Sequence, residues 1–497
     1  MTITFLGVTY NQKSAISSSS VVFGDDGNDF ITAKGGNNKV YAGEGQNIIL
    51  AGLDFAGLVP EQGIIYIQFR SDAGNNEIYS GSGNDIISTG IGNDTVYAGG
   101  GNNYIRDFGG SNTIYAGSGS DTIIVGYNDS FWDDFWGNNV IYAGEGNNTV
   151  NIFGINTTVY AGSGNDTLTA FSRGSNLIYA NEGNNIVNVY GINNTVYAGS
   201  GNDVITTSGV NAVNLIYANE GNNIVNASGI SNTIFNGSGN DIITASGVNA
   251  VNLIYANEGK NTVDVSGISN TVYTGSADDK ITAFGANANN LIYAGEGKNT
   301  INVSGRNSTV YTGSGDDLIT TSGTGGNYLI YAGEGRNTIE LSGSNNTNTV
   351  YTGSGNDIIK AFGGNTTIYA GEGNNQISLS GSNNHTVYTG SGDDSFTFNT
   401  GAGIATIYGY GNNDTILVSD PAQVTISQDN SDTVVRSGKT DILAILKDTF
   451  ANIVRVLPDA TASSAIASKG LGFNADSITN PLPKEYSLAS SYSQQKL

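Results

Sequence analysis

An aromatic residue returns along most of this chain at steps of 18, 19 or 20 residues, each time directly after an isoleucine or valine. The members of this aromatic ladder are Phe23, Tyr41, Tyr79, Tyr97, Tyr115, Tyr142, Tyr160, Tyr179, Tyr197, Tyr217, Phe235, Tyr255, Tyr273, Tyr293, Tyr311, Tyr331, Tyr351, Tyr369, Tyr388 and Tyr408. Two steps are longer. The 38 residues from Tyr41 to Tyr79 predict one degenerate coil near residues 51–75, and the 27 residues from Tyr115 to Tyr142 predict an insertion near residues 127–137. A short fixed period indicates stacked repeats, so we expect one elongated array.

Each repeat contains two turns rich in glycine and asparagine, and each turn precedes a short β-branched or aromatic run. In residues 218–235 the turns are 219–223 and 228–232, and the runs are 224–226 and 233–235. Runs this short cannot form an independent sheet, and helices do not tolerate this density of glycine, which is 71 of 497 residues. The predicted fold class is all-β: a parallel β-solenoid of roughly 20 coils of 18–20 residues, stacked about 4.8 Å apart. Strand alternation places Val225, Ile234 and Ile243 inside and the aromatic ladder on one outer face, unless a wider coil turns the rings inward.

The composition excludes several classes of protein. Acidic residues outnumber basic ones 43 to 19, and the net charge of -24 favours cations over nucleic acid or anionic membranes as partners. The chain has no cysteine and a single histidine, His385, which argues against thiol chemistry and histidine-cluster metal sites. No apolar run approaches the roughly 18 residues of a membrane span, and the first residues lack the pattern of a cleaved signal peptide. We expect no nucleic-acid binding, no membrane insertion and no enzymatic activity.

The turns carry a recurrent motif. Residues 352–360 read Thr-Gly-Ser-Gly-Asn-Asp-Ile-Ile-Lys, and residues 161–169 read Ala-Gly-Ser-Gly-Asn-Asp-Thr-Leu-Thr. They resemble the nonapeptide G-G-x-G-x-D-x-U-x of the repeats-in-toxin (RTX) family, and the resemblance extends over about residues 23–414. It implies a calcium-binding β-roll that is secreted by a type I system. The chemistry agrees, because glycine permits turns with exposed carbonyls, aspartate adds a carboxylate, and Ca²⁺ takes about six to eight oxygen ligands.

Carboxylates follow one edge of the predicted solenoid in two alternating coil types. Aspartate occurs in one type, at Asp29, Asp85, Asp121, Asp166, Asp203, Asp241, Asp279, Asp317, Asp357 and Asp394. The coils between them carry asparagine there and glutamate three residues earlier, at Glu44, Glu145, Glu182, Glu220, Glu258, Glu296, Glu334 and Glu372. We expect Ca²⁺ sites made of Asp, Glu and carbonyl oxygens between neighbouring coils. The alternative is a solubilising row of carboxylates without an ion.

The opposite turns are mostly uncharged. They carry Asn194, Asn232, Asn270, Ser308 and Asn348, with Asp94 as the exception. We predict an uncharged ladder of side chains along this edge, without calcium. His385 takes the place of an asparagine in its coil and is predicted to be a polar turn residue.

The two ends depart from the repeat. Residues 1–22 are predicted to be a cap for the first coil or an assembly strand donated to a neighbour, and residues 23–411 form the solenoid. Residues 412–460 have less glycine and several short apolar runs, which predicts a C-terminal β cap. Residues 461–497 are rich in serine and alanine and are predicted to be a flexible tail. The RTX resemblance implies that this C-terminal region carries the secretion signal.

Because repeats fill nearly the whole chain, the first interpretation of its function is structural. It describes a secreted, calcium-stabilised protein that self-associates into extracellular fibrils, a surface layer or a matrix. In composition the chain resembles the oscillin-type RTX surface proteins of filamentous cyanobacteria. The alternative is a secreted adhesin that binds a cell-surface polysaccharide, with the insertion that holds Trp132 and Trp136 as a contact site. A polysaccharide-acting enzyme ranks third, because catalysis needs clustered carboxylates and these are spread evenly.

Overall fold

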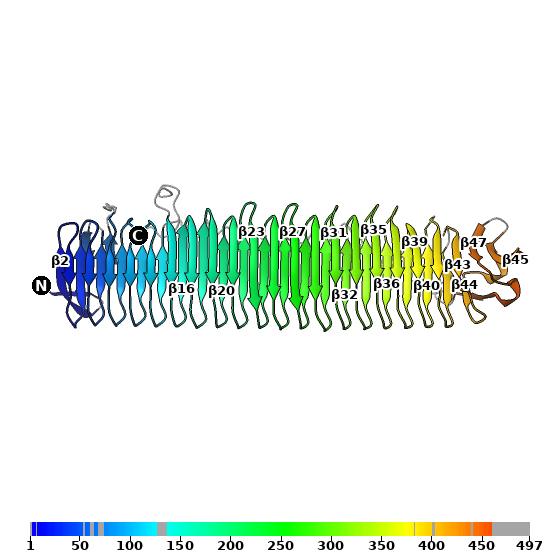
Figure 1. The fold of residues 1–497 in the computed structure, drawn as a ribbon, viewed down its shortest axis with the longest axis horizontal. Helices are drawn as coiled ribbons and strands as arrows, with labels where there is room; N and C mark the ends of the chain where they lie inside the picture. The colour runs from blue at the N-terminus through cyan, green and yellow to red at the C-terminus, as the bar shows by residue number, and fades with distance from the viewer. Residues whose placement is uncertain are drawn as a thin grey trace.

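A computed structural model of the chain describes residues 2–5, 7–52, 55–59, 64–67, 74–126, 137–381, 383–399, 403–438 and 441–459. The molecule is a long rod in which each coil adds one strand to each of two sheets (Figure 1). Neighbouring strands of the coils pair parallel and in register, so the predicted all-β parallel solenoid is confirmed. Among the described residues, no helix has the length and apolar character needed to cross a bilayer.

Two long sheets make up the rod, and we name them sheet A and sheet B. Along the rod, sheet A contains β1 (Thr2–Phe5), β2 (Val8–Ala15), β4 (Asp29–Ala33), β6 (Ile48–Ala51), β10 (Ile86–Thr89), β12 (Tyr104–Asp107), β14 (Thr122–Val125), β16 (Thr149–Gly154), β18 (Thr167–Ser172), β20 (Ile186–Tyr190), β22 (Val204–Ser208), β24 (Ile224–Ser228), β26 (Ile242–Ser246), β28 (Thr262–Ser266), β30 (Lys280–Phe284), β32 (Thr300–Ser304), β34 (Leu318–Ser322), β36 (Thr338–Ser342), β38 (Ile358–Phe362), β40 (Gln376–Ser380), β42 (Ser395–Phe398), β44 (Thr415–Val418) and β48 (Arg455–Pro458). Sheet B contains β3 (Val21–Phe23), β5 (Lys39–Tyr41), β9 (Glu77–Tyr79), β11 (Thr95–Tyr97), β13 (Thr113–Tyr115), β15 (Asn138–Tyr142), β17 (Asn156–Tyr160), β19 (Ser175–Tyr179), β21 (Asn193–Tyr197), β23 (Val213–Asn219), β25 (Ser231–Asn236), β27 (Val251–Asn257), β29 (Ser269–Thr274), β31 (Asn289–Tyr293), β33 (Asn307–Tyr311), β35 (Asn327–Tyr331), β37 (Thr347–Tyr351), β39 (Asn365–Tyr369), β41 (His385–Tyr388), β43 (Ala405–Tyr408), β47 (Asp441–Leu446), β46 (Asp432–Ser437) and β45 (Val424–Asp429).

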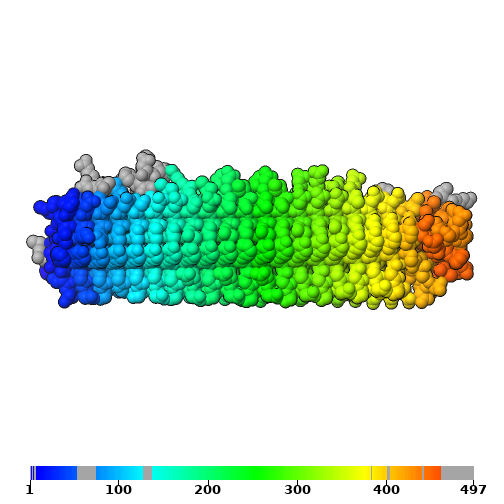
Figure 2. Space-filling view, viewed as in Figure 1, coloured from blue at the N-terminus to red at the C-terminus, as the bar shows by residue number. Residues whose placement is uncertain are grey.

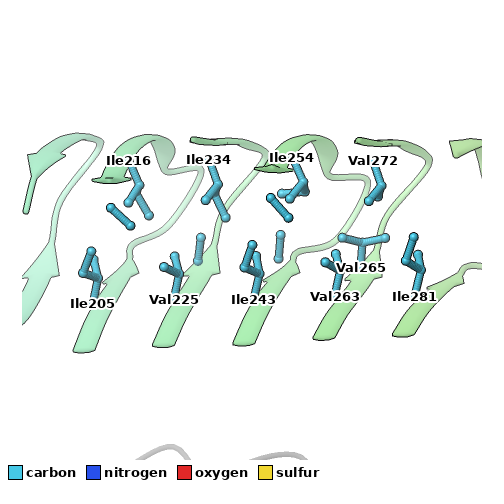
Figure 3. Packing of buried hydrophobic residues seen from close by; sticks show 14 of the residues in the cluster. Ile205, Ile216, Val225, Ile234, Ile243, Ile254, Val263, Val265, Val272 and Ile281 are labelled. Carbon is cyan, nitrogen blue, oxygen red and sulfur yellow. The ribbon is translucent and has the colours of Figure 1, made fainter. Parts of the chain in front are cut away.

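The core is a narrow double row of aliphatic side chains between the two sheets. Val225, Ile234 and Ile243 are fully buried, as the alternation of their strands predicts. Figure 3 shows one row, which includes Ile205, Val225, Ile243, Val263 and Ile281, facing a second row with Ile216, Ile234, Ile254 and Val272. Burial of one such side chain contributes about 1.5–3 kcal/mol. Stability therefore accumulates coil by coil rather than from one central core.

The aromatic ladder lies on the outer face of sheet B. Each ring stacks on the next one along the rod, with centroid separations from 4.5 Å for Tyr351–Tyr369 to 5.3 Å for Phe23–Tyr41. Most of these side chains are half-buried, because their neighbours in the stack cover both ring faces. The prediction of an outward ladder is confirmed.

The step from Tyr41 to Tyr79 corresponds to one coil and not to two. The rings of these residues stack directly at 5.0 Å, and β5 pairs in register with β9. The extra residues contain an inserted antiparallel hairpin of β7 (Phe55–Val59) and β8 (Ile64–Ile67). The predicted degenerate coil near residues 51–75 is therefore wrong, because an insertion of one coil's length leaves the repeat count unchanged.

The longer step from Tyr115 to Tyr142 does contain an insertion. These two rings also stack directly, at 4.7 Å, so Tyr115 and Tyr142 belong to neighbouring coils. Most of the predicted segment, residues 127–136 with both tryptophans, lies outside the described residues.

Both ends of the rod carry antiparallel strands. At the N-terminus β2 pairs parallel with β4, and β1 folds back on β2 with Phe5 opposite Val8. At the other end β47 continues sheet B after β43, and β46 and β45 follow it as antiparallel strands, while β48 continues sheet A after β44. Two short 3-10 helices, η3 (Pro421–Gln423) and η4 (Ala451–Ile453), connect these strands. The predicted tail, residues 461–497, lies outside the described residues.

Candidate metal-binding edge

The turns that lead from sheet B to sheet A form the acidic edge of the rod. Their glycines are required by close contacts between coils as well as by backbone conformation. Gly239 has a φ of +139°, and a Cβ atom there would lie 2.1 Å from the carbonyl oxygen of Gly221 in the preceding coil. Gly201 and Gly221 have the same relationship one coil earlier, at 1.9 Å. The spacing of the glycines thus permits turns whose carbonyls follow the axis of the rod.

All ten predicted aspartates are buried inside this edge. Each residue is at most 2% exposed, and each lies directly before a strand of sheet A, except Asp29, which is the first residue of β4. Asp241 is two residues before the inward-facing Ile243. Side chains two residues apart in an extended chain point to the same side, so that of Asp241 also points inside. Because these carboxyl groups do not face solvent, the aspartates are not a solubilising row.

Aspartate and asparagine alternate as members of one hydrogen-bonded ladder. Oδ1 of Asp241 accepts the backbone N–H of Asn223 at 2.8 Å, and Oδ1 of Asn261 accepts the backbone N–H of Asp241 at 3.0 Å. The same bond from asparagine N–H to aspartate Oδ1 recurs for every predicted aspartate after Asp29. Each coil is therefore fixed to the next one by side-chain oxygen as well as by the sheets.

The two residue types differ at their second polar atom. Nδ2 of Asn223 donates to the carbonyl oxygens of Asn219 and Gly221, at 3.1 and 3.2 Å. Aspartate has an oxygen in place of this amide nitrogen, and an oxygen cannot donate to a carbonyl unless it carries a proton. That oxygen is buried without a hydrogen-bond partner in Asp85, Asp121, Asp166, Asp203, Asp241, Asp279, Asp317 and Asp357. In Asp29 the oxygen without a partner is Oδ1, because Oδ2 accepts the backbone N–H of Asp25.

Burial also raises the pKa of these carboxyl groups. Loss of water raises the pKa of Asp85 to about 7, and those of Asp121, Asp166, Asp203, Asp279 and Asp394 to about 6. Desolvation also raises the pKa of Asp29, Asp241, Asp317 and Asp357. An ionised aspartate in this edge is thus unfavourable unless a cation compensates its charge.

The predicted glutamates lie on the outside of the same edge. Glu220 is exposed, and its Oε2 accepts the hydroxyl hydrogen of Ser238 in the following coil. The same bond joins Glu44 to Ser82, Glu145 to Ser163, Glu182 to Ser200, Glu258 to Ser276, Glu296 to Ser314, Glu334 to Ser354 and Glu372 to Ser391. Hydrogen bonds from these serines lower the pKa of Glu258, Glu296 and Glu334. The glutamates therefore lie at the surface while the aspartates lie inside.

The residues of this edge fit a calcium ion in their donor chemistry. They offer a buried carboxylate oxygen without a partner, glycine carbonyls and an outer carboxylate, which are the hard oxygen ligands that Ca²⁺ prefers. Within the part of the chain that the structure describes, no three Asp, Glu or His side chains converge on one point. A site here would consequently depend on aspartate and carbonyl oxygens. A role for the glutamates as ligands stays a prediction.

The opposite edge, where sheet A leads into sheet B, is an amide ladder. Nδ2 of Asn194 donates to Oδ1 of Asn214, and that of Asn214 donates to Oδ1 of Asn232, at 2.8 and 2.7 Å. Such bonds run without interruption from Asn176 through Asn290 to Ser308. His385 is buried in the same row, and burial lowers its pKa, so it is a neutral member. The predicted uncharged ladder is confirmed for this stretch.

Sequence reasoning missed one buried acid beside the exceptional Asp94. Oδ1 of Asp107 accepts the backbone N–H of Gly109 at 2.9 Å and an amide hydrogen of Asn112 at 2.6 Å. Desolvation raises the pKa of Asp94 to about 6 and, together with the charge of Asp94, raises that of Asp107 well above its usual value. Strand alternation could have located Asp107, because it lies two residues after the inward-facing Ile105.

The coils match a known family of repeats. A family model described as RTX calcium-binding nonapeptide repeat (4 copies) matches residues 23–55, 70–105, 88–123, 135–151, 160–191, 189–209, 208–243, 293–323 and 342–377. These segments together cover half of the chain and include most of the acidic edge. No curated protein matches the chain.

Proposed function

Since the chain belongs to the RTX calcium-binding nonapeptide repeat family, we propose that it is a secreted structural rod that Ca²⁺ stabilises and that assembles into extracellular fibrils, a surface layer or a matrix. The observation that carries this proposal is the row of buried aspartates, which follows almost the whole length of the rod. Such a row suits a scaffold in which every second coil needs the same ion. Secretion by a type I system is part of the proposal and rests on the family.

Calcium would act on stability through the buried carboxylates. When bound, Ca²⁺ supplies the positive charge that an ionised aspartate lacks in this edge. In Asp203, Asp241 and Asp279 one oxygen accepts a backbone N–H, and the other has no hydrogen-bond partner and would bind the ion. A ligand that binds only the folded state stabilises it by mass action. Folding would thus be favoured where calcium is plentiful, as it is outside cells.

The ends of the rod support assembly. At the N-terminus β3 is the outermost strand of sheet B, and its Val21 and Phe23 are 55% and 65% exposed. Open strand edges recruit further strands unless they are covered.

On sheet A the strand β1 covers β2 but presents its own edge. Residues 2–5 thus pair within their own chain, which supports a self-cap over a donated strand.

The alternatives have less support in the described residues. Sugar rings pack on exposed aromatic faces, but every ladder ring between the two end members, for example Tyr255, is covered on both faces by its neighbours. The ten predicted aspartates of the acidic edge are buried, and within the described ranges no three Asp, Glu or His side chains converge on one point. The aromatic ladder and the acidic edge therefore give less support to an adhesin or an enzyme than to a structural rod.

The test combines spectroscopy with imaging. We expect a calcium chelator to reduce the β-sheet circular dichroism signal and the melting temperature, and added calcium to restore both. Negative-stain images with calcium should show filaments or sheets. An unchanged melting temperature in chelator would refute the calcium role, and dispersed single rods at high protein concentration would refute the assembly role.

A further inference from the structure

The outer face of sheet B is free of charge over most of the rod. The strands of sheet B from β11 to β43 contain no Asp, Glu, Lys or Arg, although the chain carries a net charge of -24. Sheet A differs, because the outward positions of its strands include Asp264, Lys280, and the paired Glu340 and Lys360. Two negatively charged rods can therefore approach each other most easily through sheet B.

The aromatic ladder determines which kind of surface can pack on this face. Stacked rings such as Tyr217, Phe235 and Tyr255 present edges at intervals of 5.0 Å. The best match for a row of this period is another row with the same period, and a second copy of the chain supplies one. Figure 2 shows that side chains form straight rows along the rod on the face in view, so coil-to-coil spacing is maintained over a long distance.

Beside the aromatic ladder, leucine and threonine alternate from coil to coil. We call this the Leu/Thr row; all its members are half-buried and point outward from sheet B. The row consists of Leu177, Thr195, Leu215, Thr233, Leu253, Thr271, Leu291, Thr309, Leu329 and Thr349. Large and small side chains thus alternate with a period of two coils, about 9.6 Å.

This row is complementary to itself under one symmetry operation. A two-fold axis parallel to the strands, between β27 and β29, places Leu253 opposite Thr271 of a second copy. The remaining four leucines of the row then each face a threonine of the second copy. The outermost of these pairs is Leu177 with Thr349. The same axis keeps the aromatic ladders of the two copies opposite each other. A two-fold axis along the rod would instead place leucine against leucine, so the alternation favours antiparallel rods. Such a contact is isologous and closed.

We propose that the outer face of sheet B from β19 to β37 binds the same face of a second, antiparallel copy of this chain. This inference deepens the proposed structural role and rests on it. Ten strands about 4.8 Å apart, each about 17 Å long, give a face of about 800 Å² per copy, which equals the share of one partner in a standard stable interface. The pair buries leucine against threonine and leaves the charged glutamates of the acidic edge in water.

The test places a charge in the face without removing a ring or a leucine. Thr233→Lys combined with Thr271→Lys puts ammonium groups where the opposing strands offer no carboxylate. The control is Thr244→Lys combined with Thr282→Lys, at outward positions of sheet A in nearby coils. With calcium present, we expect sedimentation velocity to show pairs for the wild type and the control, and at least a tenfold weaker association for the face variant. A wild type that stays monomeric, or a face variant that associates equally well, would overturn the proposal.

Cross-linking tests the register independently of stability. The chain has no cysteine, so Leu215→Cys on one copy and Thr309→Cys on another are the only thiols in a mixture. The proposed axis places these two positions opposite each other, and a short bis-maleimide should join them. Leu215→Cys mixed with Thr271→Cys should react much less. Equal yields would overturn the register.

Imaging separates the lateral contact from the proposed structural role. If the lysine face variant forms filaments of the same width as the wild type, the lateral contact fails while the structural role stands. If neither the wild type nor this variant forms filaments, the structural role itself fails.

Discussion

Asp241 and Asn223 occupy the same position in neighbouring coils, and Oδ1 of Asp241 accepts the backbone N–H of Asn223 at 2.8 Å. The two side chains have the same shape and share this acceptor role. They differ in the second polar atom, which donates to turn carbonyls in Asn223 and is a buried oxygen without a partner in Asp241. One fold thus carries two kinds of coil, one satisfied by itself and one that requires a proton or a cation.

The first prediction exchanges these two residues. Asp241→Asn replaces the unpartnered oxygen with a donor for the turn carbonyls, so in chelator the variant should be more stable than the wild type. One buried unsatisfied polar group costs about 1–3 kcal/mol, which sets the expected gain. In calcium the same change removes a ligand, so the stabilisation by calcium should be smaller. Denaturant titrations with and without calcium measure both effects.

The matched control is the reverse exchange in the next coil. Asn261 lies in the ladder between Asp241 and Asp279, and its Nδ2 donates to Gly259 at 2.9 Å. Asn261→Asp should destabilise the protein in chelator and increase its response to calcium. If both exchanges shift stability in the same direction, the account of the ladder is wrong.

The second prediction concerns pH in the absence of calcium. Burial raises the pKa of Asp85 to about 7 and that of Asp121 to about 6, from an ordinary value of 3.8. The folded protein thus binds protons more tightly than the unfolded chain does. Its stability is greatest below the ordinary pKa and decreases as the pH rises through the raised values. We expect the melting temperature in chelator to fall between about pH 4 and pH 7, and saturating calcium to reduce this fall. A melting temperature that rises over this interval in chelator would contradict the burial of ionisable aspartates.

Much of this architecture could be predicted from local patterns. The period of the aromatic ladder gave the solenoid, and alternation placed Val225 and Ile234 inside, because a strand that faces both core and solvent must alternate. The separation of Asp241 from Glu220 was not predicted. Both residues belong to the same turn motif. Asp241 lies two residues before the buried Ile243, so strand alternation turns its side chain inward, whereas Glu220 lies where the chain bends outward. The hairpin after β6 was also missed, because an insertion and a degenerate coil of equal length look the same to a count of residues.

The third prediction concerns the turn glycines. Gly239→Ala would bring a Cβ to 2.1 Å from the Gly221 carbonyl oxygen and would hold alanine at a φ of +139°. We expect a loss of at least about 2 kcal/mol, because backbone strain and the contact between coils add together. Gly325→Ala is the control, since its φ is +73° but no atom lies within 4 Å of the added Cβ. This control should cost only about 1 kcal/mol. Equal losses for the two variants would show that conformation alone, and not the stacking of coils, requires glycine at position 239.

The last prediction addresses the acid pair on the opposite edge. Asp107 is fully buried and faces Asp94, and desolvation raises the pKa of both groups. Asp107→Asn removes the buried charge, and its amide oxygen can still accept the hydrogen bonds of Gly109 and Asn112. Stability above about pH 7 should therefore increase, and its decrease with rising pH should become shallower. Asp107→Ala removes the charge as well but leaves these donors unsatisfied, so it should lose about 1–3 kcal/mol relative to Asp107→Asn. Thermal melts of both variants from pH 5 to pH 9 in calcium separate the two contributions, and an Asp107→Asn variant that is less stable than the wild type at pH 9 would show that the ionised carboxylate is satisfied in its site.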